Sequence, residues 1–273
     1  YAEFVDLNKL GAVVTKGVAN VPWPGNPTPR VAEVYGGMLN AVGLQNPGID
    51  LFVERDIPFL KQFDTKIMVN VCGHSTEEYI EVVERLSDQP VDLLEINISC
   101  PNVKEGGIAF GQDPKAVEAI TKEMKKHAAQ PVIMKLSPNV TDITEMARAA
   151  EAGGADGLSL INTITGMKID INRQKFVLAN KTGGMSGPAI HPVAVRMVYQ
   201  TAQAVRLPIV GMGGIMNAED AIEMILAGAT AVSVGTANFT NPHVTEEIVA
   251  GIRDYMERYQ VADIRDLVGA VHE

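Results

Sequence analysis

Cysteine, aromatic residues and positive charge are all scarce in this chain. Among its 273 residues only Cys72 and Cys100 are cysteines, and aromatic residues make up 5%. Two cysteines in a chain of this length do not form a disulfide framework, so we expect a reducing, cytoplasmic compartment. The 33 acidic residues outnumber the 23 basic ones and give a net charge of −10. Because a nucleic-acid partner requires a basic surface, this charge argues against nucleic-acid binding.

Signals for a membrane, an export pathway or a metal are missing as well. No apolar run approaches the roughly 20 residues of a membrane span, so we expect no membrane association. Residues 1–4 hold no basic leader and no initiator methionine, so they are predicted to be an internal starting point and not a signal peptide. The motifs CxxC and HExxH do not occur, and the five histidines are scattered. We therefore expect no metal bound by protein side chains.

What the chain does contain is an alternation of apolar strands and helices, repeated about seven times. Such repeats predict parallel strands joined by helical crossovers, with both faces of the sheet covered. We expect a single domain over residues 1–273, folded as a (β/α)8 barrel with one strand unaccounted for. A doubly wound open sheet is the alternative, which the lack of GxGxxG at the first helix disfavours. The expected strands are residues 10–18, 66–73, 91–100, 131–138, 157–164, 208–214 and 231–236, and the expected helices are residues 57–63, 77–86, 114–127, 141–152, 191–205, 218–227 and 244–258.

Two further stretches complete the predicted organisation. Residues 165–186 are too long for a tight loop, and their apolar alternation predicts an inserted hairpin. Residues 36–48 are rich in glycine and carry the neutral amides of Asn40, Gln45 and Asn46. Neutral amides suit an uncharged heterocycle better than a phosphate, although plain turn chemistry explains residues 46–48.

Polar residues gather where the predicted strands end. Carboxyl ends of barrel strands form the catalytic face of such a fold. The last two strand ends are rich in glycine, and in this fold they often hold a phosphate on backbone N–H groups. The candidate residues are Lys16, Asn70, Asn97 with Cys100, Lys135, Asn162 with Thr163, Gly213 with Gly214, and Gly235 with Thr236.

Cys100 stands where the strand of residues 91–100 gives way to a loop containing Pro101 and several glycines. One interpretation is a buried cysteine that packs as a small hydrophobe. The other is a proton-transfer group on the loop of residues 101–111, which would act as a lid that excludes water. The residues themselves point to a cofactor or substrate bearing a phosphate, and the scarcity of aromatic side chains leaves few rings to stack on a flavin or nicotinamide.

The motif Asn-Ile-Ser-Cys-Pro-Asn-Val at residues 97–103 makes the comparison with a known family specific. Together with seven other motifs in the same order, it resembles the dihydroorotate dehydrogenase family over essentially the whole chain. The chain is most similar to the soluble branch whose base is a cysteine and whose catalytic subunit passes electrons to NAD. In the quinone-linked branch the base is a serine and an N-terminal helical extension is present. The other motifs are residues 15–17, 40–46, 135–140, 161–163, 183–188, 211–214 and 234–236.

This resemblance implies an FMN enzyme that oxidises dihydroorotate to orotate in pyrimidine biosynthesis. Cys100 would remove the proton from C5 while a hydride passes from C6 to FMN N5. Lys135 would lie near flavin N1 and O2, where positive charge stabilises the reduced flavin. The residues implied to bind the substrate are Lys16, Asn40, Ala41, Val42, Gly43, Leu44, Asn97, Asn162 and Thr163. Those implied to bind FMN are Lys16, Gly17, Asn70, Asn97, Lys135, Ile161, Gly187, Gly213, Gly214, Gly235 and Thr236.

The resemblance also implies partners and leaves alternatives open. It implies a homodimer core and an iron–sulfur flavoprotein subunit that carries FAD and a [2Fe–2S] cluster. Family members have a further strand and an FMN-binding turn ahead of the position of Tyr1, so we expect the first barrel strand to be missing from this sequence. The alternatives are a fumarate-linked dihydroorotate dehydrogenase, a flavin barrel acting on another pyrimidine, and a barrel without chemistry that serves in binding or assembly.

Overall fold

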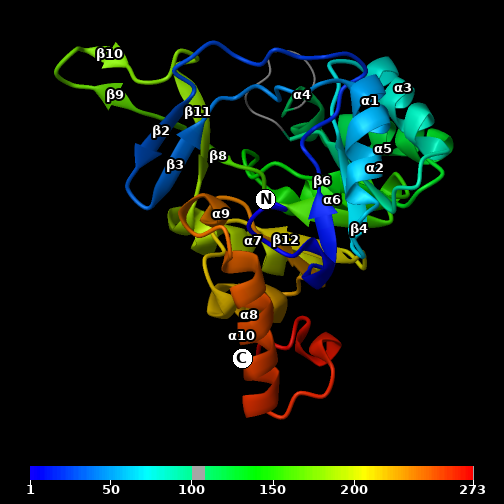
Figure 1. Cartoon of the computed structure of the whole chain (residues 1–273), viewed down its shortest axis with the longest axis vertical. Coiled ribbons are helices and arrows are strands. Elements are labelled where there is room, and N and C mark those ends of the chain that lie inside the picture. The colour runs from blue at the N-terminus through cyan, green and yellow to red at the C-terminus, as the bar shows by residue number, and fades with distance from the viewer. Residues whose placement is uncertain (100–107, 273) are drawn as a thin grey trace.

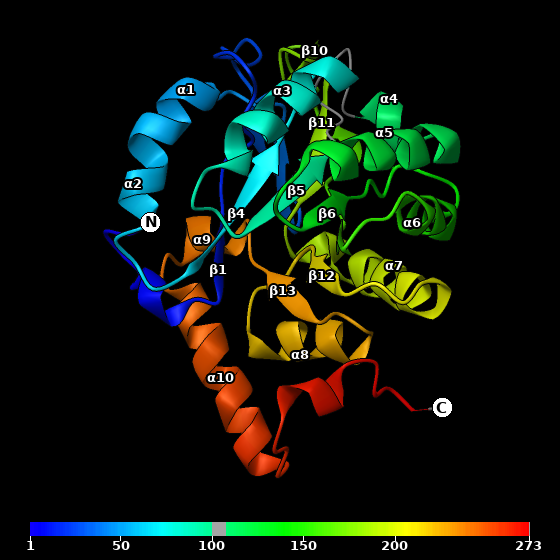
Figure 2. The same cartoon turned by 90° about the vertical axis from the view of Figure 1, so that its right-hand side faces the viewer.

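Seven parallel strands form one curled sheet at the centre of the computed structural model, which describes residues 1–99 and 108–272. Helices lie along the outside of this sheet (Figures 1 and 2). The fold is therefore the predicted α/β barrel type, and each of the seven predicted strands is confirmed. In their order across the sheet the strands are β1 (Ala12–Val14), β4 (Lys66–Val71), β5 (Leu93–Asn97), β6 (Val132–Lys135), β7 (Gly157–Leu160), β12 (Ile209–Met212) and β13 (Ala231–Ser233). The expectation that a further strand precedes Tyr1 stays a prediction.

The strands are apolar because both faces of the sheet are covered. In β5, Leu94 and Ile96 are fully buried on the side of the helices, and Glu95 between them is fully buried as well. A strand that is exposed to solvent on neither side has no face on which polar residues could be hydrated. Any polar side chain that points into the barrel must therefore find partners there.

The helices begin where short polar side chains cap them. The side chains of Ser75, Asp113 and Asn217 accept hydrogen bonds from backbone N–H groups of the first turns of α3, α5 and α8. The long helices are α3 (Thr76–Ser87), α5 (Pro114–His127), α6 (Ile143–Ala152), α7 (His191–Ala204), α8 (Ala218–Leu226) and α10 (Val244–Arg258). The shorter ones are α1 (Ile49–Leu51), the π-helical turn η2 (Phe52–Asp56), α2 (Ile57–Leu60), α4 (Ile108–Gly111), α9 (Ala237–Thr240) and the 3-10 turns η1 (Leu7–Lys9), η3 (Pro188–Ile190) and η4 (Ile264–Leu267).

A second, antiparallel sheet lies beyond the carboxyl end of the barrel, where the β4 arrow points toward it in Figure 2. It joins the predicted insertion to an N-terminal hairpin, which includes the start of the glycine-rich stretch and was not predicted. Gly36 takes a positive φ of 69° in the turn of that hairpin, a conformation that glycine adopts readily. The sheet order is β2 (Val31–Val34), β3 (Gly37–Asn40), β11 (Thr182–Ser186) and β8 (Ile164–Met167), and β9 (Ile169–Asp170) pairs with β10 (Lys175–Phe176) at the tip of the insertion.

No helix among the described residues is both long enough and apolar enough to cross a membrane.

Candidate active site

A cavity of about 230 Å³ lies where five barrel strands end beneath the second sheet. Among the described residues that line it, none is acidic, and both Lys16 and Lys135 contribute. The cavity brings together most of the predicted site residues and adds two that we did not predict, Val14 and Thr15. The predicted residues in its lining are Lys16, Gly17, Asn40, Val42, Gly43, Leu44, Asn70, Asn97, Lys135, Asn162 and Thr163.

The remaining predicted residues do not line this cavity. Ala41 and Ile161 are buried beside it, in the core. Gly187, with Gly213, Gly214, Gly235 and Thr236, forms a second group at the ends of β11, β12 and β13. Cys100 lies outside the described residues, as do residues 101–107 of the predicted lid.

Strand register places four polar side chains on the inner face of the barrel. Asn70 pairs with Glu95, and Asn97 pairs with Lys135, across neighbouring parallel strands. Residues two apart on a strand face the same side, so Glu95 and Asn97 both point inward. Asn97 Nδ2 donates to Asn70 Oδ1 at 3.2 Å, and Lys135 Nζ lies 3.3 Å from Glu95 Oε2. Asn70 Nδ2 also donates to Glu95 Oε2, which completes a continuous network under the cavity.

The end of β5 is held in place from two sides. Tyr79 of α3, fully buried, donates from its hydroxyl to the carbonyl oxygen of Asn97 at 2.7 Å. Ser99 Oγ donates to Asn97 Oδ1 at 3.0 Å and accepts from Asn162 Nδ2 at 2.7 Å. These bonds tie β5 to the segment after β7 just before the chain reaches Cys100.

Glu95 and Asn139 were not predicted as site residues, and Ser99, which we expected at the rim of the site beside Asn97 and Cys100, was assigned no binding role. Asn139 Nδ2 donates to the carbonyl oxygen of Thr163 at 3.0 Å, and its Oδ1 accepts from the Thr165 N–H at 2.9 Å. A signal for Glu95 was present, because it stands two positions before Asn97 on a strand with a period of two. Ser99 carried the same signal, because it stands two positions after Asn97, whereas Asn139 gave none, since its partners come from a distant segment.

Glycine is required where the second group of residues meets. Gly214 has a φ of +70°, and a Cβ added to it would lie 2.7 Å from the carbonyl oxygen of Gly187. A Cβ added to Gly235 would meet nothing within 4 Å, so space is open beside it. The hydroxyl of Thr236 donates to Ser186 Oγ at 2.7 Å, which links the end of β13 to β11. At these two glycine-rich strand ends, a bound group could therefore come close to the backbone without meeting a side chain.

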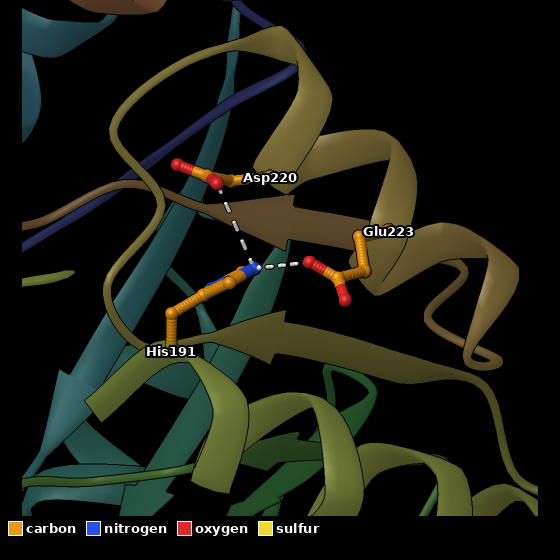
Figure 3. Close-up of side chains that lie close together, drawn as sticks. All are labelled: His191, Asp220 and Glu223. Carbon is orange, nitrogen blue, oxygen red and sulfur yellow. Dashed lines mark hydrogen bonds and ion pairs between the residues drawn. The ribbon is translucent and has the colours of Figure 1, made fainter. Parts of the chain in front are cut away.

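His191, the first residue of α7, anchors one of these strand ends (Figure 3). Its Nδ1 donates to the carbonyl oxygen of Gly213 at 2.9 Å, so Nδ1 carries a proton. Its Nε2 lies 3.2 Å from Glu223 Oε2 and 3.9 Å from Asp220 Oδ1, both on α8. These three ligand atoms lie within 4.8 Å of one another, a group that the scattered histidines of the sequence did not predict. Figure 3 shows the imidazole facing both carboxylates of α8.

Comparisons with known proteins give one consistent result. The family model described as dihydroorotate dehydrogenase matches residues 1–256. A protein of Lachnoclostridium phytofermentans named dihydroorotate dehydrogenase B (NAD(+)), catalytic subunit, is 73% identical over 271 residues, which cover 99% of this chain and 90% of that protein. Proteins with the same name from Alkaliphilus metalliredigens and Desulforamulus reducens are 64% and 55% identical, over 99% and 100% of this chain and 90% of each relative.

Proposed function

The chain belongs to the dihydroorotate dehydrogenase family, and we propose that it is the catalytic subunit of an NAD-linked enzyme that oxidises dihydroorotate to orotate in pyrimidine biosynthesis. The observation that carries this proposal is the cavity at the carboxyl ends of the barrel strands. It combines two lysines and several neutral amides with no acidic side chain among its described lining. Such a lining suits a flat, polar, anionic ring.

FMN is the cofactor that this site fits. When bound, it supplies a hydride acceptor. The open space beside Gly235 and the close backbone approach at Gly214 provide N–H groups for a phosphate at strand ends, the usual position for it in this fold. Lys16 and Lys135 provide positive charge at the cavity, and Asn70 and Asn97 provide neutral hydrogen-bonding groups. The residues that we propose for FMN binding are those that the family resemblance implies.

The substrate is proposed to lie against the amides of the same cavity. Asn40, Asn97 and Asn162 offer both donors and acceptors, which suit the alternating N–H and C=O groups of a pyrimidine ring. Lys16 suits the carboxylate. Asn139 holds the backbone of Thr163, and Ser99 holds the amide of Asn162, so these groups are preorganised before a substrate arrives.

Cys100 is proposed as the base that removes the C5 proton of dihydroorotate. It directly follows Ser99, and the bonds from Tyr79 and Asn162 fix the chain leading to it. A thiol serves better than a hydroxyl as a base at neutral pH, because its pKa is far lower and a much larger fraction of it is ionised. We propose further that the subunit works in the cytoplasm as a homodimer core with an iron–sulfur flavoprotein that carries FAD and a [2Fe–2S] cluster.

The test uses the colour of the purified protein. We expect a yellow protein that bleaches anaerobically with dihydroorotate, and a Cys100→Ser variant that keeps its FMN but is reduced at least tenfold more slowly at neutral pH. Cys72→Ala is the control, because Cys72 is buried among Ala19 and Trp23 and should leave the rate nearly intact. A Cys100→Ser variant reduced at the parental rate would refute the base assignment. Bleaching by uracil derivatives alone would favour a different pyrimidine as substrate.

A further inference from the structure

Glu95 is a charged side chain buried completely inside the barrel. It is 0% exposed, and it does not line the cavity above it. A buried carboxylate is costly unless charge and hydrogen bonds compensate it. Its Oε2 accepts from Asn70 Nδ2 and lies 3.3 Å from Lys135 Nζ. Its Oε1 has no hydrogen-bond partner among the described residues.

Both partners of Glu95 are residues of the cavity wall. Lys135 is 16% exposed at its side chain and faces the cavity, while Glu95 lies one layer deeper. Register explains this layering, because Glu95 pairs with Ile133, two positions before Lys135 on β6. Among the described residues, Glu95 is connected to the cavity through its contacts with Lys135 and Asn70.

We propose that Glu95 is a positioning residue that sets the charge and orientation of Lys135 toward the flavin. This proposal rests on the proposed function, which places FMN at Lys135. With Glu95 ionised, the pair has no net charge, and the lysine presents a compensated ammonium to the cavity. Reduction adds negative charge to the flavin, so an uncompensated ammonium favours the reduced form and a compensated one favours it less. Glu95 thereby holds the reduction potential of the flavin down.

Glu95→Gln tests this with little change in shape. The amide oxygen can still accept from Lys135 and Asn70, but the negative charge is gone. We expect the FMN reduction equilibrium of the purified holoprotein to shift at least tenfold toward the reduced form, which is about 30 mV upward for a two-electron couple. The measurement is an anaerobic redox titration against a reference dye. It reports a potential and needs no turnover.

A second variant and a matched control accompany this one. Glu95→Asp keeps the charge but withdraws it from Lys135 by one methylene group, so its potential should fall between those of the parent and Glu95→Gln. Ser159→Ala is the control, because Ser159 pairs with Lys135 on the next strand and is equally buried but uncharged. Its potential should equal the parental one, even where its thermal stability changes.

The outcomes separate this proposal from the proposed function. A parental protein whose FMN is reduced by dihydroorotate, with both Glu95 variants at the parental potential, would overturn the role of Glu95 alone. A parental protein that binds no FMN would overturn both proposals. A raised potential in both variants, with Ser159→Ala unchanged, supports the role of Glu95.

Discussion

Gly184 on β11 packs closely against Thr163. Replacing Gly184 with alanine should therefore disturb the proposed substrate site. A Cβ at this position would lie 1.9 Å from Thr163 Oγ1 and 2.6 Å from Thr163 Cβ. Gly184 also pairs with Asn40 on β3, so two proposed substrate-binding residues meet at one glycine. The substitution adds a single methyl group and leaves the chemistry of both side chains unchanged.

The size of the effect follows from the distances. Cβ atoms rarely approach another heavy atom more closely than about 3.0 Å, so Thr163 or β11 must shift by about 1.1 Å. Overpacking of this kind costs roughly 1 to 3 kcal/mol of unfolding free energy. Misplacement of a substrate-positioning residue by about 1 Å can cost on the order of 100-fold in rate. We expect kcat/KM for dihydroorotate to fall by about 10- to 100-fold in Gly184→Ala.

Steady-state kinetics and urea unfolding provide the assay, with Gly166→Ala as the matched control. Gly166 lies on β8 of the same sheet, and a Cβ there would approach only Leu39 Cδ2, at 3.1 Å. That approach is about 1.2 Å longer than the one at Gly184 and involves no proposed substrate-binding residue, so Gly166→Ala should keep kcat/KM within about twofold of the parent. Gly184→Ala with parental kcat/KM would refute the placement of Thr163 in the substrate site.

Two other predictions concern Asp92 and His191. Burial alone would raise the pKa of Asp92, but the Ile67 N–H and the Lys66 ammonium hold that pKa below its usual value. Asp92→Asn should therefore lower the unfolding free energy at pH 7 by about 1 kcal/mol in urea titrations. The stabilisation exists above the unfolded pKa and is lost as pH falls through the folded pKa, so a difference that persists at pH 2 would contradict it. His191→Phe removes the anchor of Gly213 and should weaken FMN binding several-fold in fluorescence titrations of the apoprotein. His243→Phe, at an exposed position, should leave the affinity for FMN unchanged. If His191→Phe binds FMN as tightly as the parent does, the contact between His191 and Gly213 does not contribute to FMN binding.

The sequence predicted much of the architecture because its signals are local. Seven largely apolar stretches of six to ten residues, separated by helices, indicated seven parallel strands. Ser75, Asp113 and Asn217 are residues of the type that caps helices, and each caps the helix that follows it. The prediction that polar residues converge also follows from local signals, because parallel strands place all their carboxyl ends on one side. The individual roles of these residues, and that of Cys100, stay predictions.

Where the sequence analysis was wrong or incomplete, the deciding interactions join distant segments. The glycine-rich stretch was predicted to carry neutral amides but not to form a strand, yet Gly37–Asn40 pairs with the neighbouring β2 and with β11, more than 140 residues later. The same pairing brings Asn40 to Gly184 and hence to Thr163. Glu95 was given no role from the sequence, and only the closed barrel shows that its side chain is fully buried beside Asn70 and Lys135.

By itself, then, the sequence determined the strand–helix repeat, the helix starts and the end of the sheet at which polar groups collect. Periodicity, capping and strand direction are properties of neighbouring residues, so they can be recognised in a short segment without the rest of the chain. Only the tertiary structure decided that Glu95 lies beneath Lys135, that Ser99 joins Asn97 to Asn162, and that the β2–β3 hairpin stands over the cavity. Cross-strand register creates these contacts, and register is set by the packing of the whole barrel.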